Sequence, residues 1–333
     1  MRCARLIGEG RSYYHVVSRV IERRFAYDEE EKARFVRLLH KVSAFSGVRI
    51  LTYALMSNHF HLLVEIDPDI QISEFMVLKR VGSLYGHDRK LDIKQTIDRL
   101  RTSDDTDGIE ALLDRYRCRM QDLSQFMKTL LQRATMSYNG RHERHGTLWE
   151  GRFKSVLVEG SGNALAMIAA YIDLNPVRAG IVKDPKDYRY CGYAEATAGN
   201  WRARDGLGTV LASLGQSDQG IWNAQTYRSF IFMQGTTHQK GGTDSDSFRQ
   251  RAGEVISRGG KLSRIELLHC RVRYFTDGAA IGGQIFIQDI FQKNRTQFGL
   301  KRKTGPRKLR HTAGHRLFTM RDLRRQPLVP STA

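Results

Sequence analysis

The chain has 333 residues, enough for one large or two medium domains, and it is strongly basic. Lysine and arginine number 54 against 35 aspartate and glutamate, a formal net charge of +19 that favours nucleic acid as a partner. We do not expect a membrane protein, because the sequence contains no run of about 18 apolar residues and no lipidation motif. Without a signal-peptide pattern, a cytoplasmic, nucleoid-associated protein is expected. The four cysteines are scattered and predict neither disulfides nor a zinc ribbon.

The first part of the chain alternates between strand and helix patterns. A strand is predicted at about 13–19, and large apolar residues at helical spacing predict a helix at about 29–46. A second strand, about 48–56, leads through a short Ser-Asn turn into, or continues as, a strand ending at Ile66.

Two histidines stand out on that last strand. His59 and His61 are two residues apart, and a strand sends such residues out of the same face. The opposite face is apolar: Phe60, Leu62, Val64 and Ile66. We expect the apolar face to be buried and the histidine face, with Ser57 and Glu65, to stay polar and solvated. Two neutral imidazoles on one rigid strand can bind a metal, although an isolated pair of this kind is more often structural.

A polar, charged stretch follows and is predicted to be a helical insertion at about 72–120. Next comes a predicted helix at about 123–138, which ends near a glycine. The segment 146–154 is punctuated by glycines and carries aromatic and basic residues, and it leads into a predicted strand at about 155–159.

An apolar helix is predicted at about 164–174, and Pro176 favours its end near that position. Tyr171 and Asn175 are four residues apart and therefore share a helix face. A tyrosine on an apolar helix is usually a core residue, and an asparagine beside a proline can simply cap the helix end. Neither residue predicts chemistry by itself.

Three motifs occur together in a fixed order: His59-Phe-His61, Gly146-Thr-Leu-Trp-Glu-Gly-Arg-Phe-Lys-Ser155 and Tyr171-Ile-Asp-Leu-Asn-Pro-Val-Arg-Ala-Gly180. With them the chain resembles the HUH single-tyrosine transposases, and the middle motif narrows the resemblance to the REP-associated tyrosine transposases. The resemblance covers about residues 12–193, apart from the insertion. It implies an α+β fold, a ferredoxin-like antiparallel sheet with helices on one face, and a catalytic domain at 1–195.

By this resemblance Tyr171 is the nucleophile, and His59, His61 and Asn175 bind a divalent metal ion, Mg or Mn. A tyrosine phenol, with an ordinary pKa of about 10, needs a base or a nearby cation to act as a nucleophile. The implied product is a 5′-phosphotyrosine on single-stranded DNA. A free 3′-hydroxyl can attack this product and reverse the reaction. The donor types are also compatible with Zn, Co or Ni. Related enzymes are monomers or homodimers, and both states stay open.

The hypothesis also includes a rival nucleophile and a set of candidate DNA-binding residues. Tyr138 is the rival nucleophile, but it lacks the Tyr-x-x-x-Asn arrangement. A basic and aromatic set is expected to bind DNA: Arg141, Arg144, Trp149, Arg152 and Lys154. Trp149 and Phe153 are equally compatible with stacking on a base and with ordinary packing.

The composition changes after about residue 195. Residues 196–246 are rich in small polar residues and are interpreted as a linker with short helices, and 247–333 as a basic, mainly helical DNA-binding accessory region. Helical patterns at 263–273 and 281–291 are compatible with a helix-turn-helix-like module. Residues 293–325 hold 12 lysines and arginines against one acidic residue, which predicts salt-sensitive phosphate contacts. The candidate DNA-binding residues here are Lys301, Arg302, Lys303, Arg307, Lys308 and Arg310.

The sequence therefore predicts a metal-dependent transposase and endonuclease that nicks and rejoins hairpin or palindromic single-stranded DNA. The alternative is a domesticated, catalytically silent protein that binds DNA hairpins. A hydrolytic nuclease that uses metal-activated water is a third hypothesis, and the absence of a covalent adduct would distinguish it.

Overall fold

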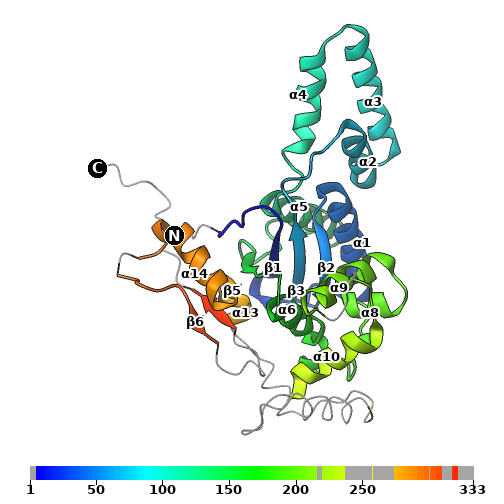
Figure 1. The fold of residues 1–333 in the computed structure, drawn as a ribbon. Coiled ribbons are helices and arrows are strands. Elements are labelled where there is room, and N and C mark those ends of the chain that lie inside the picture. The colour runs from blue at the N-terminus through cyan, green and yellow to red at the C-terminus, as the bar shows by residue number, and fades with distance from the viewer. Residues whose placement is uncertain are drawn as a thin grey trace.

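The computed structural model describes residues 5–215, 220–236, 257, 274–299, 301–309 and 317–321. Across these residues the chain forms one mixed sheet flanked by helices, in the strand order β2-β3-β1-β4-β5-β7-β6 (Figure 1). The strands are β1 (Ser12–Arg19), β2 (Arg49–Leu55), β3 (His59–Ile66), β4 (Lys154–Val158), β5 (Ala280–Gly282), β6 (Arg307–Lys308) and β7 (Phe318–Met320).

The centre of the sheet is the antiparallel set β2-β3-β1-β4. Helix α1 (Glu29–Ser46) connects β1 to β2, and α5 (Leu123–Arg141) precedes β4. This connection order, with β2 and β4 flanking the central β3 and β1, is that of a ferredoxin-like βαββαβ unit. The predicted α+β fold with a ferredoxin-like antiparallel sheet is confirmed.

Helix α1 begins and ends where its sequence predicts. The Asp28 side chain accepts a hydrogen bond from the Glu31 backbone N–H, which satisfies one of the free donors of the first turn. Gly47 ends the helix with φ of 72°, a left-handed conformation that favours glycine. Phe35 and Val42 lie on its buried face and pack toward the sheet.

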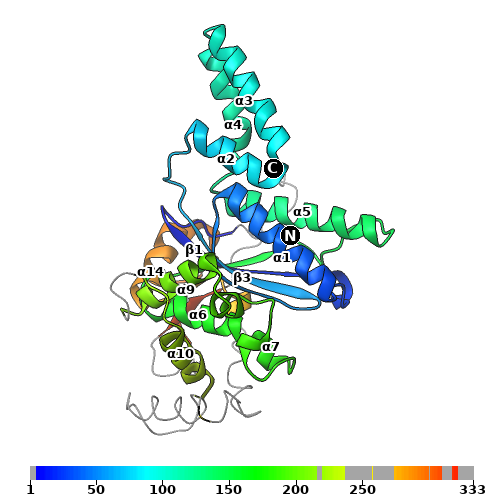
Figure 2. The same ribbon diagram turned by 90° about the vertical axis from the view of Figure 1, so that its right-hand side faces the viewer.

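The two faces of the sheet are covered by different helices. Helices α1 and α5 lie on one side of the strands, whereas α6 (Asn163–Asp173) and α9 (Trp201–Ser213) lie on the other (Figure 2). The first side buries the predicted apolar set of β3, as expected. The second side is the histidine face, where Thr52 of β2 donates a hydrogen bond to Asp173 of α6 over 2.7 Å.

The expectation of a solvated histidine face is wrong. His61 is 2% exposed and Glu65 7% exposed, because α6 and α9 cover this side of the sheet. The family resemblance implied helices on one face, and here both faces are covered. A strand's own sequence cannot reveal this, since the covering helices come from residues about a hundred or more positions later.

Three helices of the predicted insertion extend away from the sheet as an arm: α2 (Glu74–Tyr85), α3 (His87–Thr102) and α4 (Thr106–Arg117) (Figures 1 and 2). Ser73 caps α2, and Asp105 caps α4, through side chains that accept backbone N–H groups. The region is therefore helical, as its sequence pattern predicts.

Three further helices follow α6: α7 (Asn175–Arg178), α8 (Gly192–Thr197) and α10 (Ala224–Thr236). Helices α9 and α10 lie within 196–246, the segment interpreted as a linker with short helices, and Leu207 and Val210 of α9 are fully buried where this helix packs against β2. The glycines that suggested a linker serve close packing. A Cβ atom on Gly206 would lie 2.6 Å from the Ile50 carbonyl oxygen, so only glycine allows α9 to approach β2 this closely.

The accessory region contributes strands as well as helices. In addition to α13 (Tyr274–Asp277) and α14 (Gln284–Lys293), it forms β5, which pairs in parallel with β4 and covers its edge. The prediction of one helix over 281–291 is wrong at its start, because Ile281 belongs to β5 and the helix begins at Gln284. The predicted helix at 263–273 lies outside the described residues.

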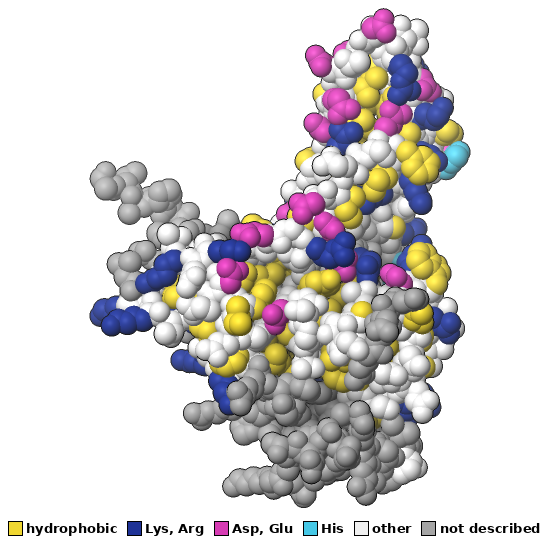
Figure 3. Space-filling model, in the orientation of Figure 1, with side chains coloured by type: hydrophobic (Ala, Val, Ile, Leu, Met, Phe, Trp, Pro, Cys, Tyr) yellow, Lys and Arg dark blue, Asp and Glu magenta, His cyan; other side chains and the backbone are white. Residues whose placement is uncertain are grey.

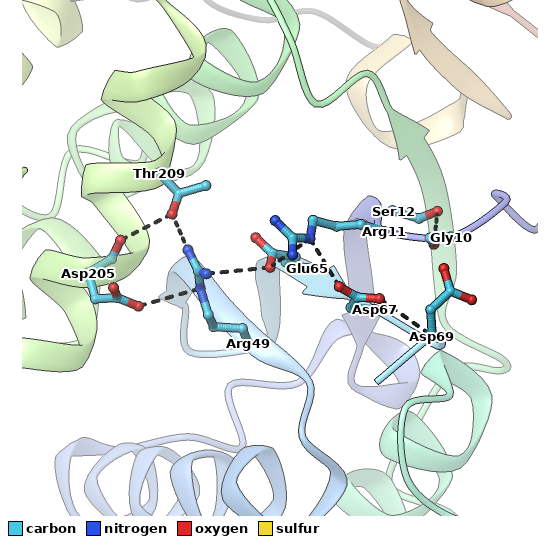
Figure 4. Close-up of polar contacts among 9 residues, drawn as sticks. All are labelled: Gly10, Arg11, Ser12, Arg49, Glu65, Asp67, Asp69, Asp205 and Thr209. Carbon is cyan, nitrogen blue, oxygen red and sulfur yellow. Dashed lines mark hydrogen bonds and ion pairs between the residues drawn. The ribbon is translucent and has the colours of Figure 1, made fainter. Parts of the chain in front are cut away.

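A polar network attaches α9 to the edge of the sheet (Figure 4). Arg49 of β2 forms ion pairs with Asp205 of α9 at 3.5 Å and with Glu65 of β3 at 3.4 Å, and it also donates to the Thr209 hydroxyl. Arg11 pairs with Asp67 at 3.1 Å beside it. Such half-exposed pairs contribute little energy but define one orientation of α9.

None of the described helices is both long enough and apolar enough to span a membrane.

Candidate active site

The histidine pair lies on β3 beneath α6. The ring centroids of His59 and His61 are 5.2 Å apart and their planes cross at 79°. Burial lowers the pKa of His59 to about 4, with the nearby Arg19 charge as a further cause. Burial, followed by the neighbouring His15 and His59, lowers the pKa of His61 well below its usual value. Both imidazoles are therefore neutral at physiological pH, which is the form that binds metals.

Helix α6 brings Tyr171 to this pair. Almost every other side chain of the helix is buried against the sheet, so its position and rotation are well determined. The Tyr171 ring lies edge-on to the His61 ring, with 5.7 Å between their centroids. The structure thus places a tyrosine and two histidines, far apart in sequence, in one site.

Two residues of α7 hold the tyrosine from the other side. The Arg178 guanidinium lies 4.0 Å from the centre of the Tyr171 ring, and its Nη2 donates to the Tyr171 carbonyl over 2.5 Å. Asn175 Nδ2 donates to the same carbonyl over 3.1 Å. The amide therefore caps the end of α6, as one alternative predicted, and this bond uses only its N–H group and not its Oδ1 atom.

His15 of β1 is a site residue that the sequence analysis missed. It is fully buried, its Nε2 lies 3.0 Å from His61 Nδ1, and its ring stacks beside that of His61 with centroids 5.2 Å apart. Burial lowers the pKa of His15 to about 4. Only the register of β1 against β3 brings the two histidines together, and the sequence pattern carries no signal of that register.

The residues present fit a divalent metal. Asn58 Nδ2 donates to the Arg23 carbonyl over 3.0 Å, so its Oδ1 is the atom that faces His59 Nδ1 at 2.7 Å and accepts a hydrogen bond from it. The Nε2 atom of neutral His59 then carries a lone pair. Within the described ranges no three His, Cys, Asp or Glu side chains are arranged to hold a metal. The predicted ligand set contains only two side chains of these types, His59 and His61, and its third member, the Asn175 amide oxygen, stays a prediction.

Cationic side chains surround the pair. Arg19 is opposite His59 in the β1–β3 ladder, and Lys154 is opposite Val17, the partner of His61. Side chains at paired positions share a face of the sheet, so both cations are on the histidine face. Lys154 was predicted as a DNA-binding residue, whereas Arg19 and Arg178 were not.

Comparisons with known proteins find relatives among the transposases. Residues 10–99 match the family described as "Transposase IS200 like". The chain resembles the IS200-like transposases. Over 82 residues it is 34% identical to the transposases for insertion sequence element IS200 of Salmonella typhimurium and of Salmonella typhi, which is 24% of this chain and 54% of each relative. The chain thus spans about half the length of these curated relatives. The predicted resemblance to this family is confirmed.

A solved structure described as a REP-associated tyrosine transposase bound to a REP hairpin is 12% identical, with a TM-score of 0.39 over 60% of this chain and 87% of that one. The match to the IS200-like family contains His59 and His61 and ends before Tyr171. The assignment of Tyr171 and Asn175 therefore depends on the motif and on the geometry of the site.

Tyr138, the rival nucleophile, lies elsewhere. It belongs to α5, on the apolar side of the sheet, and stacks on His142 with ring centroids 4.1 Å apart. Arg144 lies over the Tyr138 ring at 5.8 Å, and Arg141 forms two hydrogen bonds, of 2.8 and 2.6 Å, with the buried Glu31 carboxylate. The structure separates this group from His59 and His61.

The structure places Trp149 in the core. It is 6% exposed, packs edge-on to Phe60 with centroids 5.6 Å apart, and donates its ring N–H to the Thr135 hydroxyl over 3.0 Å. This favours packing over stacking on a base. Phe153 also packs in part against the core, while Arg152 is exposed just before β4.

The predicted basic residues of the C-terminal region divide into two groups. Lys301, Lys303, Arg307 and Lys308 are exposed, and lysine and arginine side chains gather at the edge of the C-terminal strands (Figure 3). Arg302 instead turns inward, donating to the Thr304 and Gly305 carbonyls over 3.0 Å each. Arg310 lies outside the described residues.

Proposed function

We propose that this chain is a metal-dependent transposase and endonuclease that nicks and rejoins single-stranded hairpin or palindromic DNA through a 5′-phosphotyrosine on Tyr171. The observation that carries the proposal is the contact between the Tyr171 and His61 rings, 5.7 Å apart on the histidine face of β3. The match of the segment around both histidines to the IS200-like transposases supports it.

In the proposed reaction the Tyr171 phenolic oxygen attacks the scissile phosphorus and loses its proton. The bond between phosphorus and the 3′-oxygen breaks, which releases a 3′-hydroxyl and leaves the 5′ end of the DNA on the tyrosine. Joining is the reverse, with a 3′-hydroxyl attacking the phosphotyrosine and Tyr171 regaining its proton. Because each step exchanges one phosphodiester for another, no external energy source is required.

His59, His61 and Asn175 would hold the divalent ion, Mg or Mn by family resemblance, which polarises the scissile phosphate and stabilises charge on the leaving oxygen. Arg178 keeps the tyrosine ring in position through its ring contact and its bond to the Tyr171 carbonyl. Arg19 and Lys154 lie on the same face of the sheet and are suited to binding the phosphates on either side of the scissile bond.

The proposed division of labour assigns the chemistry to residues 1–195 and additional DNA affinity to the basic C-terminal region. The exposed cations at Lys301, Lys303, Arg307 and Lys308 support that affinity. We further propose that the site forms within one chain, whether the protein is a monomer or a homodimer, because Tyr171 contacts His61 of its own chain. The resemblance to the REP-associated tyrosine transposases, carried by the motif at 146–155, implies palindromic repeats as the DNA substrate.

The decisive experiment is incubation of the protein with labelled single-stranded hairpin DNA and Mn²⁺ or Mg²⁺, followed by a denaturing gel and mass spectrometry. We expect a covalent DNA adduct on the peptide that contains Tyr171. Tyr171→Phe should lower adduct formation at least about 10³-fold, because it removes only the nucleophilic oxygen, and should leave DNA binding unchanged.

Tyr138→Phe is the matched control and should retain the activity. Cleavage that survives in Tyr171→Phe but is lost in Tyr138→Phe would show that the tyrosine is wrongly assigned. Cleavage without an adduct would favour a hydrolytic nuclease, and binding without cleavage would favour a silent hairpin-binding protein.

A further inference from the structure

The C-terminal region reaches the active site through one side chain. His15 lies between two partners, with Nδ1 2.6 Å from the Phe275 carbonyl oxygen and Nε2 3.0 Å from His61 Nδ1. Phe275 is in α13, at the start of the part of the accessory region that joins the sheet. The hydrogen bonds that link Phe275, His15 and His61 thus connect that region to a proposed metal ligand.

The protons on the ring nitrogens of His15 and His61 can be assigned by elimination. A carbonyl oxygen only accepts hydrogen bonds, so His15 Nδ1 must carry a proton and donate it to Phe275. His15 is fully buried and its two hydrogen-bond partners, a carbonyl and an imidazole, are both uncharged, so nothing in these contacts stabilises a second proton on it. His15 Nε2 is then the acceptor, and His61 Nδ1 must be the donor.

One tautomer of His61 follows. With its proton on Nδ1, neutral His61 has a lone pair on Nε2, the atom on the opposite side of the ring from His15. His59 is brought to the same state by Asn58. Both histidines of the pair therefore present Nε2 atoms that can bind a metal.

We propose that His15 is a positioning residue, which holds the His61 ring in the Nδ1–H tautomer needed for metal binding and is itself held by the Phe275 carbonyl of the C-terminal region. The inference rests on the metal site of the proposed function. Metal-binding histidines commonly donate their second N–H to a carboxylate, a carbonyl or a water, which sets both the tautomer and the orientation of the ring, and here His15 Nε2 takes the place of that acceptor.

Phe275 also touches the nucleophile. Its ring lies edge-on to the Tyr171 ring with 5.0 Å between centroids, and Tyr171 in turn lies 5.9 Å from the His15 ring. One residue of the C-terminal region thus contacts both the proposed nucleophile and the support of a proposed ligand. The region therefore does more than add affinity for DNA, since it completes the surroundings of the reacting groups.

A pair of full-length variants separates positioning from packing. His15→Gln keeps an amide N–H for Phe275 and an amide oxygen for His61, with a spacing similar to that of the two ring nitrogens. His15→Leu fills the space without either bond. The readout is Mn²⁺ affinity by isothermal titration in the absence of DNA, after circular dichroism has confirmed that each variant folds.

We expect His15→Leu to weaken Mn²⁺ binding by about 10- to 100-fold, the range seen when such supporting partners are removed, while His15→Gln stays close to the wild type. Equal affinity in all three proteins would overturn the proposal, and so would equal weakening in both variants, because packing alone would explain it.

A second test measures the wild-type protein itself and uses a variant only to assign the signals. Long-range ¹⁵N–¹H NMR spectra of histidine-labelled protein distinguish the two nitrogens of each ring, and His61 can be assigned by comparison with His61→Ala. We expect the metal-free protein to show His61 protonated at Nδ1. A proton at Nε2 would overturn the proposal even if the DNA adduct on Tyr171 is found, and the predicted tautomer would stand even if no adduct forms, so the two hypotheses fail separately.

Discussion

The two faces of β3 come from the same eight residues, but they pack against different parts of the chain. The apolar face packs under α1 and α5, which are part of the same ferredoxin-like unit, and it buries Phe60 and Leu62 completely. The histidine face packs under α6 and α9 and meets residues from distant segments of the chain. One face thus provides stability from within the unit, and the other assembles a site from far-apart sequence.

The largest expected contrast comes from one substitution on each face. Phe60→Ala removes a ring that packs against Phe35 and Trp149, and it should lower the free energy of unfolding by about 3–5 kcal/mol. His59→Ala removes a half-exposed ring with one side-chain hydrogen bond, and it should cost about 1 kcal/mol or less. Urea denaturation measures both values.

The order of the two substitutions should be the opposite for activity. His59→Ala should lose metal-dependent cleavage, whereas Phe60→Ala should keep its cleavage rate per folded molecule at temperatures where it is folded. If His59→Ala unfolds more easily than Phe60→Ala, the division between a stabilising face and a functional face is wrong.

A pH-dependent prediction sharpens the comparison on the histidine face. Asp173, the last residue of α6, is fully buried and accepts hydrogen bonds from Thr52 and Tyr227, yet burial raises its pKa to about 7. A raised carboxyl pKa contributes stability below its unfolded value near 4, and that stability is lost as the pH rises through 7. The loss amounts to at most about 4 kcal/mol for a shift of about three units.

Asp173→Asn should therefore flatten the dependence of the unfolding free energy on pH between about 4 and 7. Thermal or urea unfolding across this range measures it, with Asp205→Asn on the exposed side of α9 as a matched control that should change the profile little. An unchanged slope in Asp173→Asn would mean that the hydrogen bonds from Thr52, Tyr227 and the Tyr193 backbone N–H outweigh the burial of the carboxylate.

The smallest effect concerns the C-terminal cations. Replacing Lys303, Arg307 and Lys308 with alanine should weaken DNA binding and lower the salt slope of the affinity by about one for each phosphate that these side chains bind. Fluorescence anisotropy at several salt concentrations measures the slope. Arg302→Ala is a contrasting variant that should act through folding, because its guanidinium donates to backbone carbonyls. An unchanged slope in the triple variant would exclude this surface from DNA binding.

The C-terminal half was harder to predict than the first 175 residues for a physical reason. Residues 196–246 are rich in small polar residues, which favours a linker, but Gly206 within this segment allows α9 to approach β2 closely. The apolar run at Ala280 and Ile281 is too short to distinguish a strand from a helix. These residues form a strand because they pair with the edge of β4. Local periodicity carries no information about such a neighbour.

By itself the sequence determined the elements of the ferredoxin-like unit, the helical insertion and the identity of the histidine pair, because these follow from periodicity, caps and motif spacing within short segments. Tertiary structure alone decided that α6 and α9 bury the histidine face, that Tyr171 and not Tyr138 lies beside His61, and that His15 connects His61 to Phe275. These contacts join residues from separate segments through strand register and helix packing, which depend on the whole fold and not on any one segment.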